Sequence, residues 1–95
     1  MVVESNPLRL HLVITGHVQG VAFRYSAQRQ ARLLGLNGWV RNMPDGSVEA
    51  VVEGKPEAAR SFVTWTNSGP SSAAVDSVET DEESPRGELG FRILL

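Results

Sequence analysis

The stretch LRLHLVITGHVQGVAFRYSAQRQARLLGL, residues 8–36, contains a strand pattern, a glycine-containing turn and a helix pattern in succession. In residues 8–15 the large apolar side chains of Leu8, Leu10, Leu12 and Ile14 alternate with Arg9, His11, Val13 and Thr15, which is the period of a β-strand with one buried face. The apolar residues of the next segment recur at spacings of four, four and three: Phe23, Ala27, Ala31 and Leu34. That spacing predicts an amphipathic helix, and Gly35 suits its left-handed C-terminal cap.

The following residues predict a hairpin and a second helix. Residues 38–42 form a strand pattern, residues 43–46 are typical of a turn, and a third strand has the inward residues Val48, Ala50 and Val52. Pro56 suits the first turn of a helix, and the helix is predicted to end at residues 67–70. The predicted buried face of this helix comprises Ala59, Phe62, Val63 and Thr66.

The C-terminal part has weaker patterns. Residues 74–80 are a strand candidate, although Val75 and Val78 fall on opposite faces unless a bulge intervenes. We expect the acids at 81–83 to lie with Ser84-Pro85 in a solvated loop. A last strand is predicted from Phe91, Ile93 and Leu95.

The predicted order β-α-β-β-α-β-β is that of an α+β split βαβ sandwich, an antiparallel sheet with two helices on one face. Strands joined by one helix run parallel through a right-handed crossover, and a hairpin strand can insert between them. The carboxyl ends of the first two strands then share one sheet edge, which brings the turn before Arg24 next to Asn42. We expect one domain over residues 1–95, with residues 1–7 as a loose tail.

Composition excludes several classes of function. A net charge of −2 disfavours a nucleic-acid partner, because phosphate backbones are bound mainly by Lys and Arg. The absence of cysteine removes disulfides, thiolate nucleophiles and the usual structural zinc sites. No apolar run reaches 18 residues and no export signal is seen, so we expect no membrane partner and a cytoplasmic protein.

The turn from Gly16 to Arg24 has the properties of an anion site. The first amides of the helix near Phe23 are unpaired, the helix dipole is positive there, and Gly20 allows close backbone approach. A cation in the first turn of a helix is disfavoured by about 0.3–1 kcal/mol, so we expect a negatively charged group beside Arg24. A phosphate would satisfy it through bidentate contacts, and a surface carboxylate is the alternative.

Asn42 is a neutral donor and acceptor that can hold a water beside a dianion. The alternative is that it caps the turn that follows. Asp45-Gly46 has a turn explanation only. His11 and His17 lack organised acidic neighbours in sequence, so we expect them to be solvated and to bind no metal.

Two motifs carry a family resemblance. GHVQGVAFR, residues 16–24, resembles the first signature of the acylphosphatase family, and GWVRN, residues 38–42, resembles the second. The second is followed by matching positions at Gly46, Val48 and Gly54. The resemblance extends from about Leu10 to the final strand, so it covers nearly the whole chain.

The resemblance implies a ferredoxin-like enzyme that hydrolyses the carboxyl-phosphate bond of small acyl phosphates without metal or cofactor. Arg24 and Asn42 would be catalytic, with Asn42 orienting the attacking water. Arg24 would also bind the substrate phosphate, together with the backbone of Gln19, Gly20, Val21, Ala22 and Phe23. Expected substrates are of the acetyl phosphate, carbamoyl phosphate or 1,3-bisphosphoglycerate type, and a monomer is the expected state.

Two alternatives use the same topology without catalysis. An anion-binding regulatory domain would keep the phosphate turn and lack turnover. An RNA-binding module needs exposed aromatics on its third strand, whereas residues 47–53 contain acids and no aromatic residue. Phosphate release from an acyl phosphate separates the three hypotheses.

Overall fold

The computed structural model describes residues 6–95 and contains two helices and five strands. The elements in chain order are β1 (Leu8–His17), α1 (Phe23–Leu33), β2 (Asn37–Asn42), β3 (Val48–Gly54), α2 (Pro56–Thr66), β4 (Ala74–Glu83) and β5 (Phe91–Ile93). Residues 1–5 of the expected N-terminal tail lie outside the described part, and β1 begins directly after residues 6 and 7.

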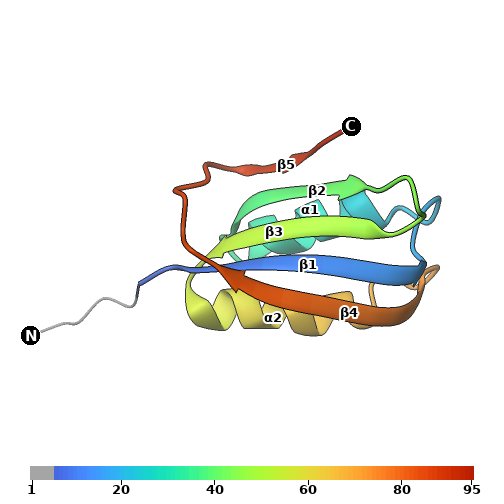
Figure 1. The fold of residues 1–95 in the computed structure, drawn as a ribbon, viewed down its shortest axis with the longest axis horizontal. Helices are drawn as coiled ribbons and strands as arrows, with labels where there is room; N and C mark the ends of the chain where they lie inside the picture. The colour runs from blue at the N-terminus through green and yellow to red at the C-terminus, as the bar shows by residue number, and fades with distance from the viewer. Residues whose placement is uncertain (1–5) are drawn as a thin grey trace, which may run out of the picture.

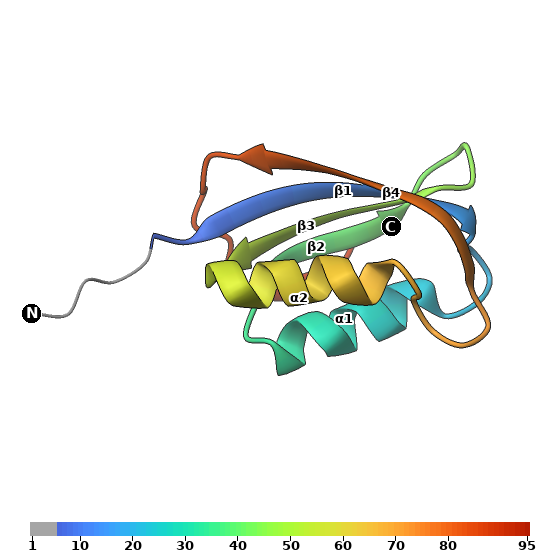
Figure 2. The same ribbon diagram turned by 90° about the horizontal axis from the view of Figure 1, so that it is seen from below.

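The five strands form one sheet in the order β4-β1-β3-β2-β5 (Figure 1). Strand β3 lies between β1 and β2 and is antiparallel to both, so β1 and β2 run parallel, as the sequence predicted. Strand β5 pairs parallel with β2, which makes the sheet mixed rather than wholly antiparallel. Both helices cover the same face of the sheet (Figure 2).

The core lies between that sheet face and the helices. The predicted inward residues of β1 and β3 are buried, apart from the half-buried Leu8 at the start of β1. From α2, Phe62 is fully buried, with its ring centroid 5.9 Å from that of Trp65 and 6.2 Å from that of Phe91. Burying a side chain such as Phe62 contributes about 1.5–3 kcal/mol to stability. Leu95, predicted to belong to the last strand, instead lies exposed beyond the end of β5.

Strand β4 differs from the prediction in its length. A bulge, the condition on which the strand candidate depended, is present: Thr15 pairs with Ser77 and Gly16 with Val75, which leaves Asp76 as the extra residue. Val75 and Val78 consequently both pack against the core. The loop predicted for residues 81–83 is wrong, because β4 continues its pairing with β1 through Glu83.

A buried ion cluster explains why β4 continues. Arg9, only 2% exposed, donates through Nε to Glu83 at 2.9 Å, and through Nη1 to Glu88 at 2.9 Å and Glu53 at 3.3 Å. The Glu53 carboxylate also accepts three backbone N–H groups at 2.7–2.9 Å, those of Arg86, Gly87 and Glu88. Burial alone would raise the pKa of Glu53, but these hydrogen bonds outweigh it and lower that pKa.

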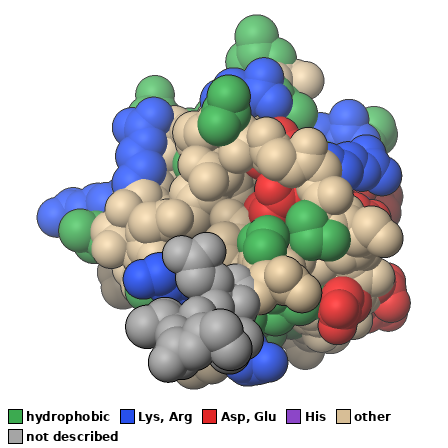
Figure 3. Space-filling model, turned by 90° about the vertical axis from the view of Figure 1, so that its left-hand side faces the viewer, with side chains coloured by type: hydrophobic (Ala, Val, Ile, Leu, Met, Phe, Trp, Pro, Cys, Tyr) green, Lys and Arg blue, Asp and Glu red, His purple; other side chains and the backbone are tan. Residues whose placement is uncertain are grey.

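The cluster holds the connection between β4 and β5 against the end of the sheet. Figure 3 shows this end of the molecule, where acidic side chains lie recessed among backbone and other atoms.

Each helix has 11 residues, and in the described part of the chain no helix has the length and apolarity needed to cross a membrane.

Candidate active site

The loop between β1 and α1 has an unusual backbone. Gly16 has φ +127° at the β4 bulge, where a Cβ would stand 2.2 Å from the carbonyl oxygen of Ala74. Gly20 has φ +73°, and Ala22 has φ +60° in the left-handed region. That conformation costs a non-glycine residue about 1–2 kcal/mol. Backbone strain of this kind concentrates at functional sites, where surrounding structure maintains it.

The N-terminus of α1 is open. Ala22 is the cap residue and supplies no side-chain hydrogen bond, and the first turn contains no acidic residue. The unpaired amides and positive dipole end of α1 are therefore not neutralised by its own side chains. Arg24 lies half-buried in this first turn, and no ion pair within residues 6–95 involves it. The described structure thus supplies no carboxylate partner for Arg24.

A hollow of about 280 Å³ opens at this helix end. Its walls are formed by Val18, Gly20, Ala22, Phe23, Arg24, Tyr25 and Asn42. Arg24 and Asn42, 18 positions apart in the chain, therefore border the same hollow. The loop after β1 and the β2–β3 turn lie at the same end of the molecule (Figure 1).

The Asn42 side chain is not held as a turn cap. Its Oδ1 is buried and has no hydrogen-bond partner within the described part of the chain. The following turn is capped by Asp45, whose Oδ1 accepts from the backbone N–H of Ser47 at 2.9 Å and from its hydroxyl at 2.6 Å. The hydrogen bonds from Ser47 lower the pKa of Asp45. Leaving a buried acceptor unpaired costs about 1–3 kcal/mol, so Asn42 is not placed there for stability.

Side chains from distant segments hold the loop. Gln19 Nε2 donates to the backbone carbonyls of Met43 at 2.8 Å and Ser47 at 2.9 Å, and the Ser72 hydroxyl donates to the carbonyl of Val21 at 3.1 Å. These positioning contacts were missed in the sequence, where Gln19 was considered only for its backbone. Ser72 lies 51 residues from Val21 and belongs to no motif, so no sequence signal pointed to it.

The predicted phosphate-binding residues divide into two groups. Gly20, Ala22, Phe23 and Arg24 line the hollow together with Asn42. The two remaining residues, Gln19 and Val21, are not among its lining residues. The Gln19 side chain is directed to the β2–β3 turn, and the Val21 side chain is buried in the core.

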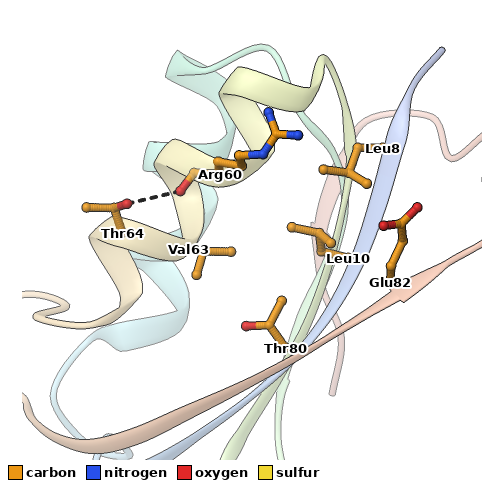
Figure 4. Close-up of a pocket in the computed structure, with 7 residues that line it drawn as sticks. All are labelled: Leu8, Leu10, Arg60, Val63, Thr64, Thr80 and Glu82. Atoms are coloured by element: carbon orange, nitrogen blue, oxygen red, sulfur yellow. Dashed lines mark hydrogen bonds between the residues drawn. The ribbon is translucent and has the colours of Figure 1, made fainter. Parts of the chain in front are cut away.

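A larger hollow of about 420 Å³ lies elsewhere, between α2 and strands β1 and β4 (Figure 4). Leu8, Leu10 and Val63 form its apolar part, with Arg60 on the helix side and Glu82 on the strand side. Its α2 residues are in the middle of the helix, where the backbone amides are already bonded within the helix. The smaller hollow at α1 is therefore the better candidate for binding an anion.

The histidines lie apart from this hollow. His11 was expected to be solvated, but it is half-buried on the sheet face opposite the helices and bonds through Nε2 to Glu49 Oε2. Arg41 Nε donates to the other oxygen of Glu49 at 2.6 Å. Burial alone would raise the pKa of Glu49, but the bonds from His11 and Arg41 lower it. His17 is exposed, and within residues 6–95 no group of three or more acidic or histidine side chains is arranged to hold a metal ion.

Comparison with known proteins gives a consistent result. The acylphosphatase family model matches residues 10–93. An acylphosphatase of Thermococcus kodakarensis is 52% identical over 87 residues, which span 92% of this chain and 96% of that protein. The structure of an acylphosphatase from Coxiella burnetii superimposes with a TM-score of 0.91 at 36% identity and 94% coverage of both chains. That of Bacillus subtilis acylphosphatase gives 0.90 at 37% identity, covering 93% of this chain and 99% of its own.

Proposed function

The chain belongs to the acylphosphatase family and hydrolyses the carboxyl-phosphate bond of acyl phosphates, and we propose that the hollow bordered by Arg24 and Asn42 is its active site. The observation that carries this assignment is the meeting of the two residues, from separate motifs, at an uncapped helix N-terminus. An open helix end and an arginine together favour a phosphate dianion.

Substrate binding is assigned to Arg24 and the backbone of residues 19–23. The guanidinium would contact two phosphoryl oxygens, and amides of the loop and the first helical turn would bind the third. Three features support this: the missing cap, the missing first-turn acid, and the absence of an ion pair to Arg24 within residues 6–95. The left-handed Ala22 supports it further, because a strained loop is better explained by ligand binding than by stability.

We assign to Asn42 the role of binding and orienting the attacking water. The amide borders the hollow and Asp45 caps the adjacent turn, so turn capping does not explain why an amide is present at position 42. A neutral amide can accept from or donate to a water without repelling the phosphate dianion, as a carboxylate would.

The reaction then needs little more than positioning and charge. The water oxygen forms a bond to phosphorus as the bond from phosphorus to the acyl oxygen breaks, and the water's extra proton passes to a phosphoryl oxygen. An acyl phosphate dianion and water thus give a carboxylate and dihydrogen phosphate. Because the carboxylate is a good leaving group, no strong base is required, and Arg24 supplies positive charge in place of a metal ion.

The test is phosphate release from acetyl phosphate and benzoyl phosphate by the purified protein, with and without a metal chelator. We expect release above the spontaneous rate in both conditions. No release above that rate would contradict the hydrolase assignment. Loss of release on chelation would contradict the metal-free mechanism alone.

We further propose that the chain acts as a monomeric, single acylphosphatase domain in the cytoplasm, on substrates of the acetyl phosphate, carbamoyl phosphate or 1,3-bisphosphoglycerate type. The residues that line the hollow lie within one stretch of the fold, where the β1–α1 loop meets the end of β2. A cysteine-free chain requires no oxidising compartment. Sedimentation of the active protein at several concentrations tests the monomer, and a dimer at assay concentration would contradict it.

A further inference from the structure

Tyr25 is an exposed aromatic residue beside the candidate active site. It follows Arg24 in the first turn of α1 and lines the same hollow. Its exposed fraction is 73%, whereas all three phenylalanines, Phe23, Phe62 and Phe91, are at most 2% exposed. The fold therefore does not use the Tyr25 ring for its core.

The wall around Tyr25 is mostly apolar. Beyond Arg24 and Asn42, the side chains that line the hollow carry no charge, and the phenol is the only polar one among them. Phe23 is buried in the core, so it presents little surface to a ligand. With a phosphate in the charged part of the hollow, the acyl group bonded to it would lie within a few ångströms, close enough to reach Tyr25 in the wall of the same hollow.

We propose that Tyr25 binds the acyl group and gives the enzyme a preference for acyl phosphates with an aromatic or larger apolar acyl group over acetyl phosphate. The inference rests on the proposed active site at Arg24 and Asn42. An exposed ring can pack against an aromatic acyl group by stacking and apolar contact. The acetyl methyl group is too small to cover much of the ring, so it gains little from the same contact.

The test compares kcat/KM for benzoyl phosphate and acetyl phosphate, after subtraction of spontaneous hydrolysis. Tyr25→Ala is expected to lower the benzoyl phosphate value about 5- to 10-fold and the acetyl phosphate value by less than about 2-fold. Tyr25→Phe is expected to keep the wild-type ratio of the two substrates, because the ring remains. Leu33→Ala is the matched control, since Leu33 is 74% exposed on the same helix and does not line the hollow, and it should change neither value.

Two outcomes would overturn the proposal. An equal loss on both substrates in Tyr25→Ala would mean that the residue supports phosphate binding or the loop. No change on either substrate would mean that the ring does not contact the acyl group. Failure of the proposed active site gives a different result, since Arg24→Ala would then retain wild-type rates on both substrates.

Discussion

Gln19 Nε2 donates a 2.8 Å hydrogen bond to the backbone carbonyl oxygen of Met43, the residue directly after Asn42. The same nitrogen donates to the carbonyl of Ser47, at the other end of the turn. The loop that carries the candidate phosphate site is thereby joined to the turn beside the residue assigned to the water. The spacing between the candidate phosphate loop and the turn beside Asn42 is therefore maintained by protein contacts.

Gln19→Ala is expected to lower kcat about tenfold while costing only about 1 kcal/mol of stability. The stability loss is small because both carbonyls keep a backbone partner: Met43 O accepts from Gly46, and Ser47 O accepts from Met43. Steady-state kinetics and urea unfolding measure the two effects. Gln28→Ala is the control, because its amide donates to Phe91 O away from the site, and it should leave kcat unchanged. Equal kcat in both variants would contradict a positioning role for Gln19.

Arg24→Ala is expected to reduce kcat/KM about 10³-fold or more, since it removes the one cationic side chain that lines the hollow. Competitive inhibition by inorganic phosphate should weaken in parallel, because free phosphate uses the same contacts. Arg29→Ala removes an exposed arginine of the same helix and controls for the change in net charge. Retained phosphate inhibition in Arg24→Ala would place the anion site elsewhere.

Asn42→Ala is expected to lower kcat by about 10²-fold, with a much smaller effect on KM. Stability should stay unchanged or rise by up to about 1 kcal/mol, because the substitution removes a buried acceptor that has no partner in the described part of the chain. Single-turnover rates and urea unfolding of the same preparation give both values. Normal acetyl phosphate turnover in Asn42→Ala would remove the residue from the mechanism.

Acid should weaken the cluster around Glu53. Its pKa is lower in the folded than in the unfolded protein, so its contribution to stability is complete above the ordinary carboxyl pKa of about 4.3 and is lost as the pH falls below it. Glu53→Gln is expected to cost about 3 kcal/mol at pH 7 and to make the decline between pH 5 and 3 shallower.

Urea unfolding at several pH values measures both effects. Glu79→Gln is the control, because Glu79 is exposed on β4 and belongs to no ion pair within residues 6–95. An acid-induced decline in Glu53→Gln as steep as that of the wild type would show that other carboxyl groups carry the pH dependence.

The sequence alone predicted the split βαβ order and the meeting of Arg24 with Asn42. Strand and helix periodicity are local properties of a chain, so residues 8–36 predicted β1 and α1 without knowledge of any distant contact. Right-handed crossover then placed Arg24 and Asn42 at one sheet edge, and both line the same hollow. For β4 the sequence left a bulge open as the condition for placing Val75 and Val78 on one face, and the strand register shows that bulge.

Tertiary structure alone decided the length of β4, the pairing of His11 with Glu49 and the direction of the Gln19 side chain. In each case a polar residue that local rules assign to solvent, or to no particular contact, finds a partner far along the chain. Glu83 extends a strand because Arg9, 74 residues earlier, is buried beside it. A carboxylate's preference for loop or strand depends on whether its charge is paired, and that pairing exists only after the sheet has formed.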